Sequence, residues 1–194
     1  MSPITHLLAG WAVANAASLS RRERALVTLA GVVPDIDGLG AIAELLTRDA
    51  ERPLDWWSRY HHVLCHNVGF ALVVAAAAWL LSSRRSLTAA LALLSFHLHL
   101  LGDVLGARGP DGYPWPIPYL LPFSSAWQIT WSGQWALNAW QNFAITGGLL
   151  AFTFYLAWRR GFSPVEIFSV RADGVFVETL RNRFGAPPHS AAAR

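Results

Sequence analysis

Residues 87–105 read LTAALALLSFHLHLLGDVL, an apolar run that carries His99 and Asp103 near its end. Residues four apart share one face of a helix, so a helix here presents the imidazole and the carboxylate together. Ionisable groups at membrane depth are costly, and by default they mark a functional site. The two side chains could grip one metal ion or form a hydrogen-bonded structural pair.

The composition indicates a small integral membrane protein with one domain. Of its 194 residues, 54% are hydrophobic and 14% are charged, and the mean hydropathy is +0.33. A soluble domain has about 25% charged residues. All fifteen basic residues are arginines, and no basic run is interleaved with aromatics, so we expect no nucleic-acid partner. The lone Cys65 excludes an internal disulfide and a cysteine-only metal site.

Five hydrophobic segments predict an all-α fold, a polytopic membrane helix bundle with about five transmembrane helices. Only the last segment is a clean span by the rule of about 20 apolar residues, because the others are short or carry polar groups. No positive region precedes the first segment, so we expect a retained helix rather than a signal peptide. The segments are residues 3–19, 25–46, 66–81, 87–105 and 136–158.

The arginines predict how these segments are oriented, because positive residues accumulate on the cytoplasmic side. Arginine groups at 21–24, 84–85 and 159–160 follow the first, third and fifth segments. All three groups are cytoplasmic only if the chain enters with its N-terminus outside, crosses five times and ends inside. This topology leaves only four arginines outside, namely Arg48, Arg52, Arg59 and Arg108.

Under this topology, ionisable residues from four short clusters meet in the outer half of the membrane. At 1.5 Å per residue, Asp35 and Asp37 lie roughly 16–20 Å from the cytoplasmic face, His99 about 20 Å and His66 about 27 Å. The first segment also begins at this outer end. The predicted metal ligands are therefore His6, Asp35, Asp37, His61, His66, His99 and Asp103.

Neutral imidazoles together with carboxylates suit Zn²⁺ or a similar divalent first-row metal. Seven ligands exceed one tetrahedral site, which favours two ions or leaves one carboxylate as general base. Asp37 and Asp103 are the candidates for that catalytic role. Asp35 could instead serve as a helix N-cap after Pro34.

Two further histidines are left outside the predicted ligand set. His97 lies on another helical face than His99, so we expect it to be structural or to support a ligand. His62 is four residues from His66, but His61 is the better placed ligand if a helix begins at His66.

The motifs occur in a fixed order: Thr5-His6, then Pro34-Asp35-Ile36-Asp37, then His61 and His66 followed by Asn67, then His99 and Asp103. In this combination, and with the Trp–Pro stretch after Asp103, roughly residues 1–125 resemble the YdjM-like (LexA-regulated) family of membrane-bound metal-dependent hydrolases. The resemblance implies a bacterial inner-membrane protein with several helices and a metal-dependent hydrolase activity. The fifth hydrophobic segment and the tail lie outside it.

The pattern is also distantly similar to the helical zinc-dependent phospholipase C and P1-type nuclease enzymes, which use His/Asp-rich multi-zinc centres on phosphodiesters. One motif departs from the family, whose usual segment is His-Arg-Gly-x-Thr-His-Ser. Here it reads His61-His62-Val63-Leu64-Cys65-His66-Asn67. The missing Arg and Gly argue against a phosphate contact there, while both ligand histidines stand.

These expectations combine into an integral membrane metal-dependent hydrolase with one or two Zn²⁺ ions. It would act on a phosphoester of a lipid or lipid-linked substrate at the outer face, with the lipid bilayer as its partner. The alternative is a non-catalytic metal-binding membrane protein or a divalent-ion carrier.

The remaining segments carry fewer signals. Residues 108–134 are rich in proline and aromatics, cannot form regular helix and are expected to lie over the outer surface as a lid. We divide the chain into a membrane-embedded domain, 1–161, and a cytoplasmic tail, 162–194. In the tail, Ala172-Asp173-Gly174 predicts a small β-hairpin, and residues 185–194, with His189, are expected to be disordered.

Overall fold

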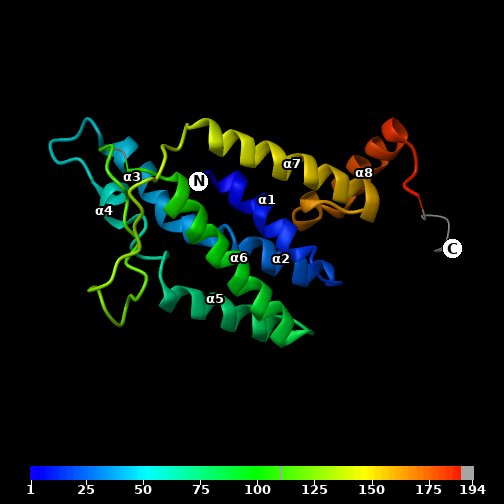
Figure 1. Ribbon diagram of the computed structural model, residues 1–194, viewed down its shortest axis with the longest axis horizontal. Helices are drawn as coiled ribbons and strands as arrows, with labels where there is room; N and C mark the ends of the chain where they lie inside the picture. Colours follow the sequence, from blue (N-terminus) through cyan, green and yellow to red (C-terminus); the bar gives the residue numbers. More distant parts are fainter. Residues whose placement is uncertain (110, 189–194) are drawn as a thin grey trace.

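The computed structural model describes residues 1–109 and 111–188, and over these residues the protein is all-α (Figure 1). Its only β-pairing there is an isolated bridge between Ile117 and Ile129. The elements are α1 (Pro3–Ala14), α2 (Arg21–Ala30), η1 (Val33–Leu39), α3 (Gly40–Thr47), α4 (Trp56–Tyr60), α5 (Val68–Leu81), α6 (Arg85–Gly106), α7 (Trp140–Arg160), η2 (Pro164–Ile167) and α8 (Val170–Phe184).

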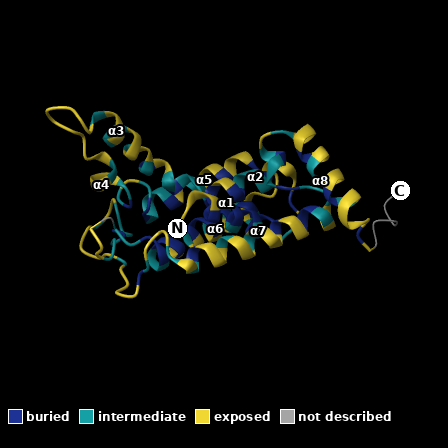
Figure 2. Ribbon diagram, turned by 90° about the horizontal axis from the view of Figure 1, so that it is seen from above, coloured by how far each residue is buried: buried dark blue, intermediate teal, exposed yellow. Residues whose placement is uncertain are grey.

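Helix α6 is the central element, because it contacts α1, α2 and α5, while α7 lies along α1. Buried residues concentrate on α1 and α6 in the middle of the bundle, and the outward face of α7 is exposed (Figure 2). Trp11, Val27 and Phe96 are among the most deeply buried apolar side chains. Helices α3 and α4 lie at one end of the molecule and α8 lies at the other.

A close crossing of α1, α2 and α6 sets the positions of the predicted metal ligands on α1 and α6. A Cβ added at Gly10 would lie 2.7 Å from the carbonyl oxygen of Thr28 and 2.8 Å from Oγ of Ser95. Only glycine therefore allows the three helices to approach this closely. Gly10 is one turn beyond His6, and Ser95 is one turn before His99, so the crossing brings these two histidines together.

The sequence predicts about five transmembrane helices, but fewer helices than that are long and apolar enough to span a membrane. In the described residues, α6 alone is long and apolar enough to span a membrane, and α2 with η1 and α3 would add one more, bent by 51°. Helices α1 and α5 are apolar but shorter. The expected clean span at 136–158 is not among them, because α7 begins at Trp140 and includes the polar Gln141, Asn142, Arg159 and Arg160.

The predicted β-hairpin in the tail is wrong, because these residues form α8. Ser169 caps the helix by accepting a hydrogen bond from the N–H of Ala172. Asp173, Val177 and Leu180 are buried at helical spacing. The Asp–Gly pair that suggests a turn therefore lies inside the first turns of a helix. The division at residue 161 stays a prediction, and part of the disorder prediction, residues 189–194 with His189, lies outside the described residues.

Candidate metal centre

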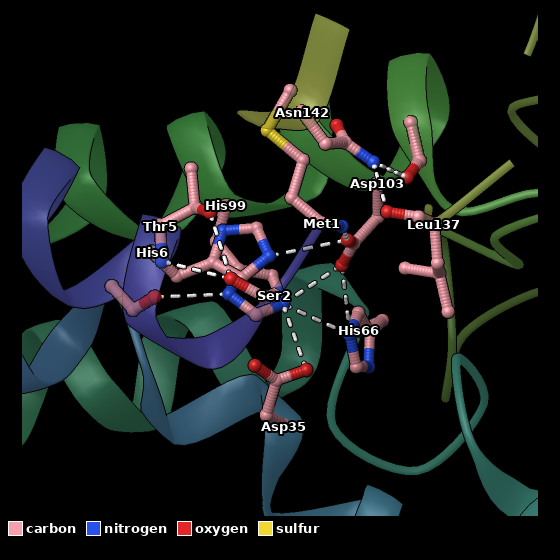
Figure 3. Close-up of polar contacts among 12 residues, drawn as sticks. Met1, Ser2, Thr5, His6, Asp35, His66, His99, Asp103, Leu137 and Asn142 are labelled. Atoms are coloured by element: carbon pink, nitrogen blue, oxygen red, sulfur yellow. Dashed lines mark hydrogen bonds and ion pairs between the residues drawn. The ribbon is translucent and has the colours of Figure 1, made fainter. Parts of the chain in front are cut away.

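The seven predicted ligands come from four elements, and the structure brings them to one end of the bundle. The carboxylate of Asp103 lies at the centre, with His6, His66, His99 and Asp35 around it (Figure 3). His6 is on α1 and Asp35 on η1, while His99 and Asp103 are on α6. Asp37 is on η1, and His61 and His66 lie between α4 and α5.

Local sequence explains why two of these elements are short or irregular. Pro34 stands at the start of η1, where its missing N–H is tolerated, and the tight 3₁₀ turn follows directly after α2. Asn67 caps α5 by accepting a hydrogen bond from the N–H of Phe70 at 2.9 Å. The helix therefore begins at Val68 rather than at His66, which leaves residues 61–67 free to bend around the site.

One group of four residues, His6, Asp35, His99 and Asp103, could hold a metal ion. Oδ1 of Asp103 lies 3.2 Å from Nε2 of His6, and it also contacts the amino group of Met1. Oδ2 of Asp103 lies 2.9 Å from Nε2 of His99, whose distance to Oδ1 of Asp35 is 3.7 Å. All four side chains are buried or nearly so, with Asp35 the most exposed at 15%.

The hydrogen bonds of two histidines leave their Nε2 atoms as electron-pair donors. Nδ1 of His99 lies 2.9 Å from the carbonyl oxygen of Gly31, which can only accept, so this nitrogen carries the proton. Nδ1 of His66 lies 3.1 Å from a carboxylate oxygen of Asp37, which requires the same tautomer in a neutral ring. The two Nε2 atoms nevertheless lie only 3.0 Å apart.

Asp37 fixes the orientation of two histidines. Its Oδ1 accepts a hydrogen bond from Nδ1 of His61 at 2.7 Å, and its Oδ2 accepts from Nδ1 of His66 and from the N–H of Cys65. A carboxylate behind a histidine is the arrangement that commonly fixes the tautomer of a metal ligand. Both oxygens of Asp37 are thus occupied by hydrogen bonds. Asp37 contacts only Nδ1 of each histidine, so it leaves their Nε2 atoms available.

His62 joins the site although the sequence left it outside the ligand set. Together with His61 and His66 it forms a second group that could hold a metal ion. Its side chain is fully buried, and neither ring nitrogen has a hydrogen-bond partner. Burial lowers the pKa of His62 well below its usual value, because the charged ring would be desolvated. Both nitrogens of the ring are thus without a hydrogen bond, and either could donate an electron pair to a cation.

His97, the other histidine left outside the ligand set, is held by hydrogen bonds at both ring nitrogens. Nδ1 of His97 lies 2.7 Å from the carbonyl oxygen of Leu93, and its Nε2 lies 2.7 Å from the hydroxyl of Tyr119. Both ring nitrogens are therefore occupied, away from the cluster around Asp103.

The segment after α6 covers the histidine cluster. Apart from residue 110, which is not described, residues 107–139 contain no helix, as the prolines predicted. The ring of Trp115 lies 4.5 Å from that of His62 and 5.0 Å from that of His61. The side chain of Gln134 accepts a hydrogen bond from the N–H of Trp115 and donates one to the carbonyl oxygen of Asp103. The expected lid thus lies over the site, while its placement at a membrane surface stays a prediction.

A cavity of about 420 Å³ leads to the cluster. Its polar wall includes Asp35, His61 and Asp103, and its apolar wall includes Pro3, Leu39, Trp57, Trp115 and Leu137. A larger cavity of about 490 Å³ lies between α5 and residues 121–123 and is lined by none of the predicted ligands. The smaller cavity is therefore the one that reaches the predicted ligands.

The donor set fits a divalent metal ion. Oδ2 of Asp103, Oδ2 of Asp35 and both nitrogens of His62 are buried without a hydrogen-bond partner. A proton on Nε2 of His99 could serve only one of the facing carboxylate oxygens of Asp35 and Asp103, whereas a cation between the three residues would contact all of them. Ligands about 2.1 Å from a tetrahedral zinc are about 3.4 Å apart, and the separations of the donor atoms of His6 and His99 from Asp103, and of His99 from Asp35, are 2.9–3.7 Å.

The comparisons with known proteins identify the family. Searches of the curated proteins and of the solved structures found no match. The family model described as YdjM inner membrane protein matches residues 1–170. The match extends beyond the roughly 125 residues on which the sequence resemblance rested, so it includes α7 and η2. The chain therefore belongs to the YdjM inner membrane protein family.

Proposed function

We propose that the protein is a metal-dependent hydrolase of the inner membrane that cleaves a phosphoester of a lipid or lipid-linked substrate. The observation that carries this proposal is the set of buried acceptor atoms around Asp103, which borders a cavity on one side. The amino group of Met1 contacts Oδ1 of Asp103, but Oδ2 of Asp103 and Oδ2 of Asp35 are buried without a hydrogen-bond partner, and a cation would compensate them. The family supports the inner-membrane location.

In this proposal, His6, Asp35, His99 and Asp103 hold the ion, and Zn²⁺ suits their mixed nitrogen and oxygen donors. When bound, such an ion acts as a Lewis acid and activates water for hydrolysis. We assign Asp37, which the sequence offers as a ligand or a base, to orienting His61 and His66, because hydrogen bonds occupy both of its oxygens.

The general base we propose is Asp35, in place of Asp37 and Asp103. Its Oδ2 has no hydrogen-bond partner, and the residue lines the cavity through which water and substrate arrive. Asp103, in contrast, has His6, His62, His66 and His99 within 4 Å and is almost fully buried. Oδ1 of Asp35 faces His99 and would be its ligand atom, whereas Oδ2 would accept the proton of the water that attacks phosphorus and pass it to the departing alcohol oxygen.

The walls of the cavity support a lipid substrate. The apolar residues Leu39, Trp57, Trp115 and Leu137 lie around the charged end of the cavity. A phosphoester would place its headgroup at the acceptor cluster and its hydrocarbon part against these side chains. Tryptophans are enriched where a membrane meets water, which agrees with the proposed position at the outer face.

The proposal is tested by metal analysis of the purified protein, followed by two hydrolysis assays in mixed micelles. One assay measures phosphate release from phosphatidic acid, and the other measures headgroup release from phosphatidylcholine. We expect at least one of these activities to be lost with a chelator and restored by Zn²⁺. His99→Ala should lose metal and activity, whereas the control His97→Ala should keep both, since His97 bonds only to Leu93 and Tyr119.

Metal-free wild-type protein, or His99→Ala protein that hydrolyses as fast as wild type, would contradict the proposal. Bound metal without turnover of either lipid would favour the non-catalytic alternative. The packing beneath the site argues against an ion carrier, because the crossing of α1, α2 and α6 at Gly10 leaves no room even for a methyl group.

A further inference from the structure

His62 combines two costly features that the family resemblance does not explain. Its backbone φ is +67°, in the left-handed region that residues other than glycine adopt at a cost. Its imidazole is completely buried, yet Nδ1 and Nε2 both lack a hydrogen-bond partner. Unpaired buried polar groups and strained backbone persist mainly where a functional role holds them in place.

The surroundings of His62 contain electron-pair donors, and no described group donates a hydrogen bond to either of its ring nitrogens. Its ring centroid lies 4.5 Å from that of His61 and 4.7 Å from that of His66. Nε2 of His62 lies 3.8 Å from Oδ2 of Asp103. Trp115 packs over the ring at 4.5 Å, which keeps bulk water away. The missing partner is thus best supplied by a cation.

The two neighbouring histidines are prepared for the same cation. Asp37 holds both of their Nδ1 atoms, so Nε2 is the atom that each ring can offer to a metal ion. One ligand atom from each of His61, His62 and His66 can be chosen within 4.8 Å of the other two. Three imidazoles on one side of the site are therefore close enough to bind one ion.

We propose that His61, His62 and His66 hold a second transition-metal ion, next to the ion held by His6, Asp35, His99 and Asp103. This inference rests on the proposed function and deepens it to a two-ion centre. Asp103 connects the two positions, because its Oδ1 faces His6 and its Oδ2 faces His62 and His66. An all-imidazole set selects ions such as Zn²⁺, Ni²⁺ or Cu²⁺ over Mg²⁺ or Ca²⁺.

His62→Gly is the decisive variant, because glycine adopts φ +67° without strain and so preserves the loop. We expect two Zn²⁺ per wild-type chain by metal analysis after dialysis, and one per His62→Gly chain. Added imidazole should fill the vacated space and restore the second equivalent. The control His97→Gly should keep two, because His97 bonds only to Leu93 and Tyr119.

His62→Cys gives a second readout that does not depend on counting ions. With Co²⁺ in place of Zn²⁺, a thiolate ligand produces a sulfur-to-cobalt charge-transfer band that an imidazole ligand does not. We expect this band in His62→Cys and not in the wild type or in a His97→Cys control. Direct ligation by position 62 would be established even if His62→Gly protein proved too unstable to purify.

The outcomes separate this inference from the proposed function. One ion in the wild type and one in His62→Gly, or no band in His62→Cys, would overturn the second ion and leave the first intact. In that case His99→Ala alone would remove the metal. A wild-type chain without any metal would overturn both proposals. Two ions that fall to one in His62→Gly but stay at two in His97→Gly support the two-ion centre.

Discussion

Nε2 of His66 and Nε2 of His99 face each other at 3.0 Å, although each ring uses its Nδ1 to donate a hydrogen bond elsewhere. The two residues come from different elements, the loop before α5 and the helix α6. The hydrogen bonds to Asp37 and to the carbonyl group of Gly31 therefore fix the orientation of the two rings. Substituting the residues that hold the ligands should thus affect metal binding, as substituting the ligands themselves should.

Asp37→Asn should weaken metal binding without removing a ligand. The amide keeps the size of the side chain but loses its charge and can accept at only one of its two positions, so His61 and His66 are no longer both oriented. Changes of this kind cost about 10–100-fold in metal affinity. The measurement is a competition titration against a chromophoric chelator.

Asp49→Asn is the matched control for Asp37→Asn, because Asp49 is exposed and contacts only Arg48. Its metal affinity should equal that of the wild type. If the affinity of Asp37→Asn also stays within twofold of the wild type, Asp37 does not orient the ligands.

The sequence predicts which residues gather around Asp37 and Asp103 better than it predicts the shape of the fold. Carboxylates and histidines within apolar runs, such as Asp103 in 87–105, stand out without a structure because burial would be too costly without a function. His62 could not be found in this way. Its role depends on a positive φ and on burial under Trp115, and neither is encoded in its spacing from His66.

The differences between the predicted and the observed fold have a common cause, because short sequence patterns do not show which side chains they pack against. The pair Asp173-Gly174 is compatible with a hairpin turn and with the first turns of a helix. Only the burial of Val177 and Leu180 at helical spacing favours the helix. Likewise, 136–158 is apolar on average, but its helix begins later and includes Gln141 and Asn142. Asn142 is buried and donates a hydrogen bond to the carbonyl oxygen of Gly106, which is 36 residues away in the sequence.

Gly10→Ala should destabilise the protein and weaken its metal site together. The added methyl group would lie 2.7 Å from the carbonyl oxygen of Thr28 and 3.2 Å from its Cα, and backbone atoms cannot move aside cheaply. Overpacking of this kind costs about 1–3 kcal/mol. Because Gly10 is one turn from His6, separation of α1 from α6 would also move His6 away from Asp103. Thermal unfolding in detergent and the chelator competition measure the two effects.

Gly147→Ala in α7 provides the contrast, because an added Cβ there meets no atom within 4 Å. A helix-interior glycine is less favourable than alanine by about 1 kcal/mol. We therefore expect unchanged or slightly higher stability, and unchanged metal affinity. Equal destabilisation by the two substitutions would show that the close crossing at Gly10 is not what holds α1 against α6.

Glu166→Ala should lower the stability at the opposite end of the molecule. Glu166 is buried and accepts hydrogen bonds from Nε of Arg24 at 2.6 Å and from Nη2 at 2.8 Å. The guanidinium group of Arg24 also lies over the ring of Phe162. Removing one partner of a buried ion pair costs about 3–5 kcal/mol, since the other charge is left uncompensated.

A double-mutant cycle with Arg24→Ala measures this coupling. The double variant should be less destabilised than the sum of the two single variants, and metal affinity should be unchanged in all three. The exposed pair of Arg48 and Asp49 serves as the control, because exposed ion pairs contribute little. Additive effects at Arg24 and Glu166 would mean that their contact does not join α2 to η2.

The N-out, C-in topology can be tested with single cysteines on either side of α6. In a Cys65→Ser background, Ser83→Cys and Ser125→Cys place exposed thiols before and after this helix. Since α6 is long and apolar enough to span a membrane, the two thiols should lie on opposite sides. The positive-inside rule places Ser83, next to Arg84 and Arg85, in the cytoplasm.

A membrane-impermeant maleimide added to intact cells should therefore label Ser125→Cys alone, and both variants only after permeabilisation. Labelling of Ser83→Cys alone would invert the topology and move the metal centre to the cytoplasmic face, whereas labelling of both in intact cells would show that α6 does not cross.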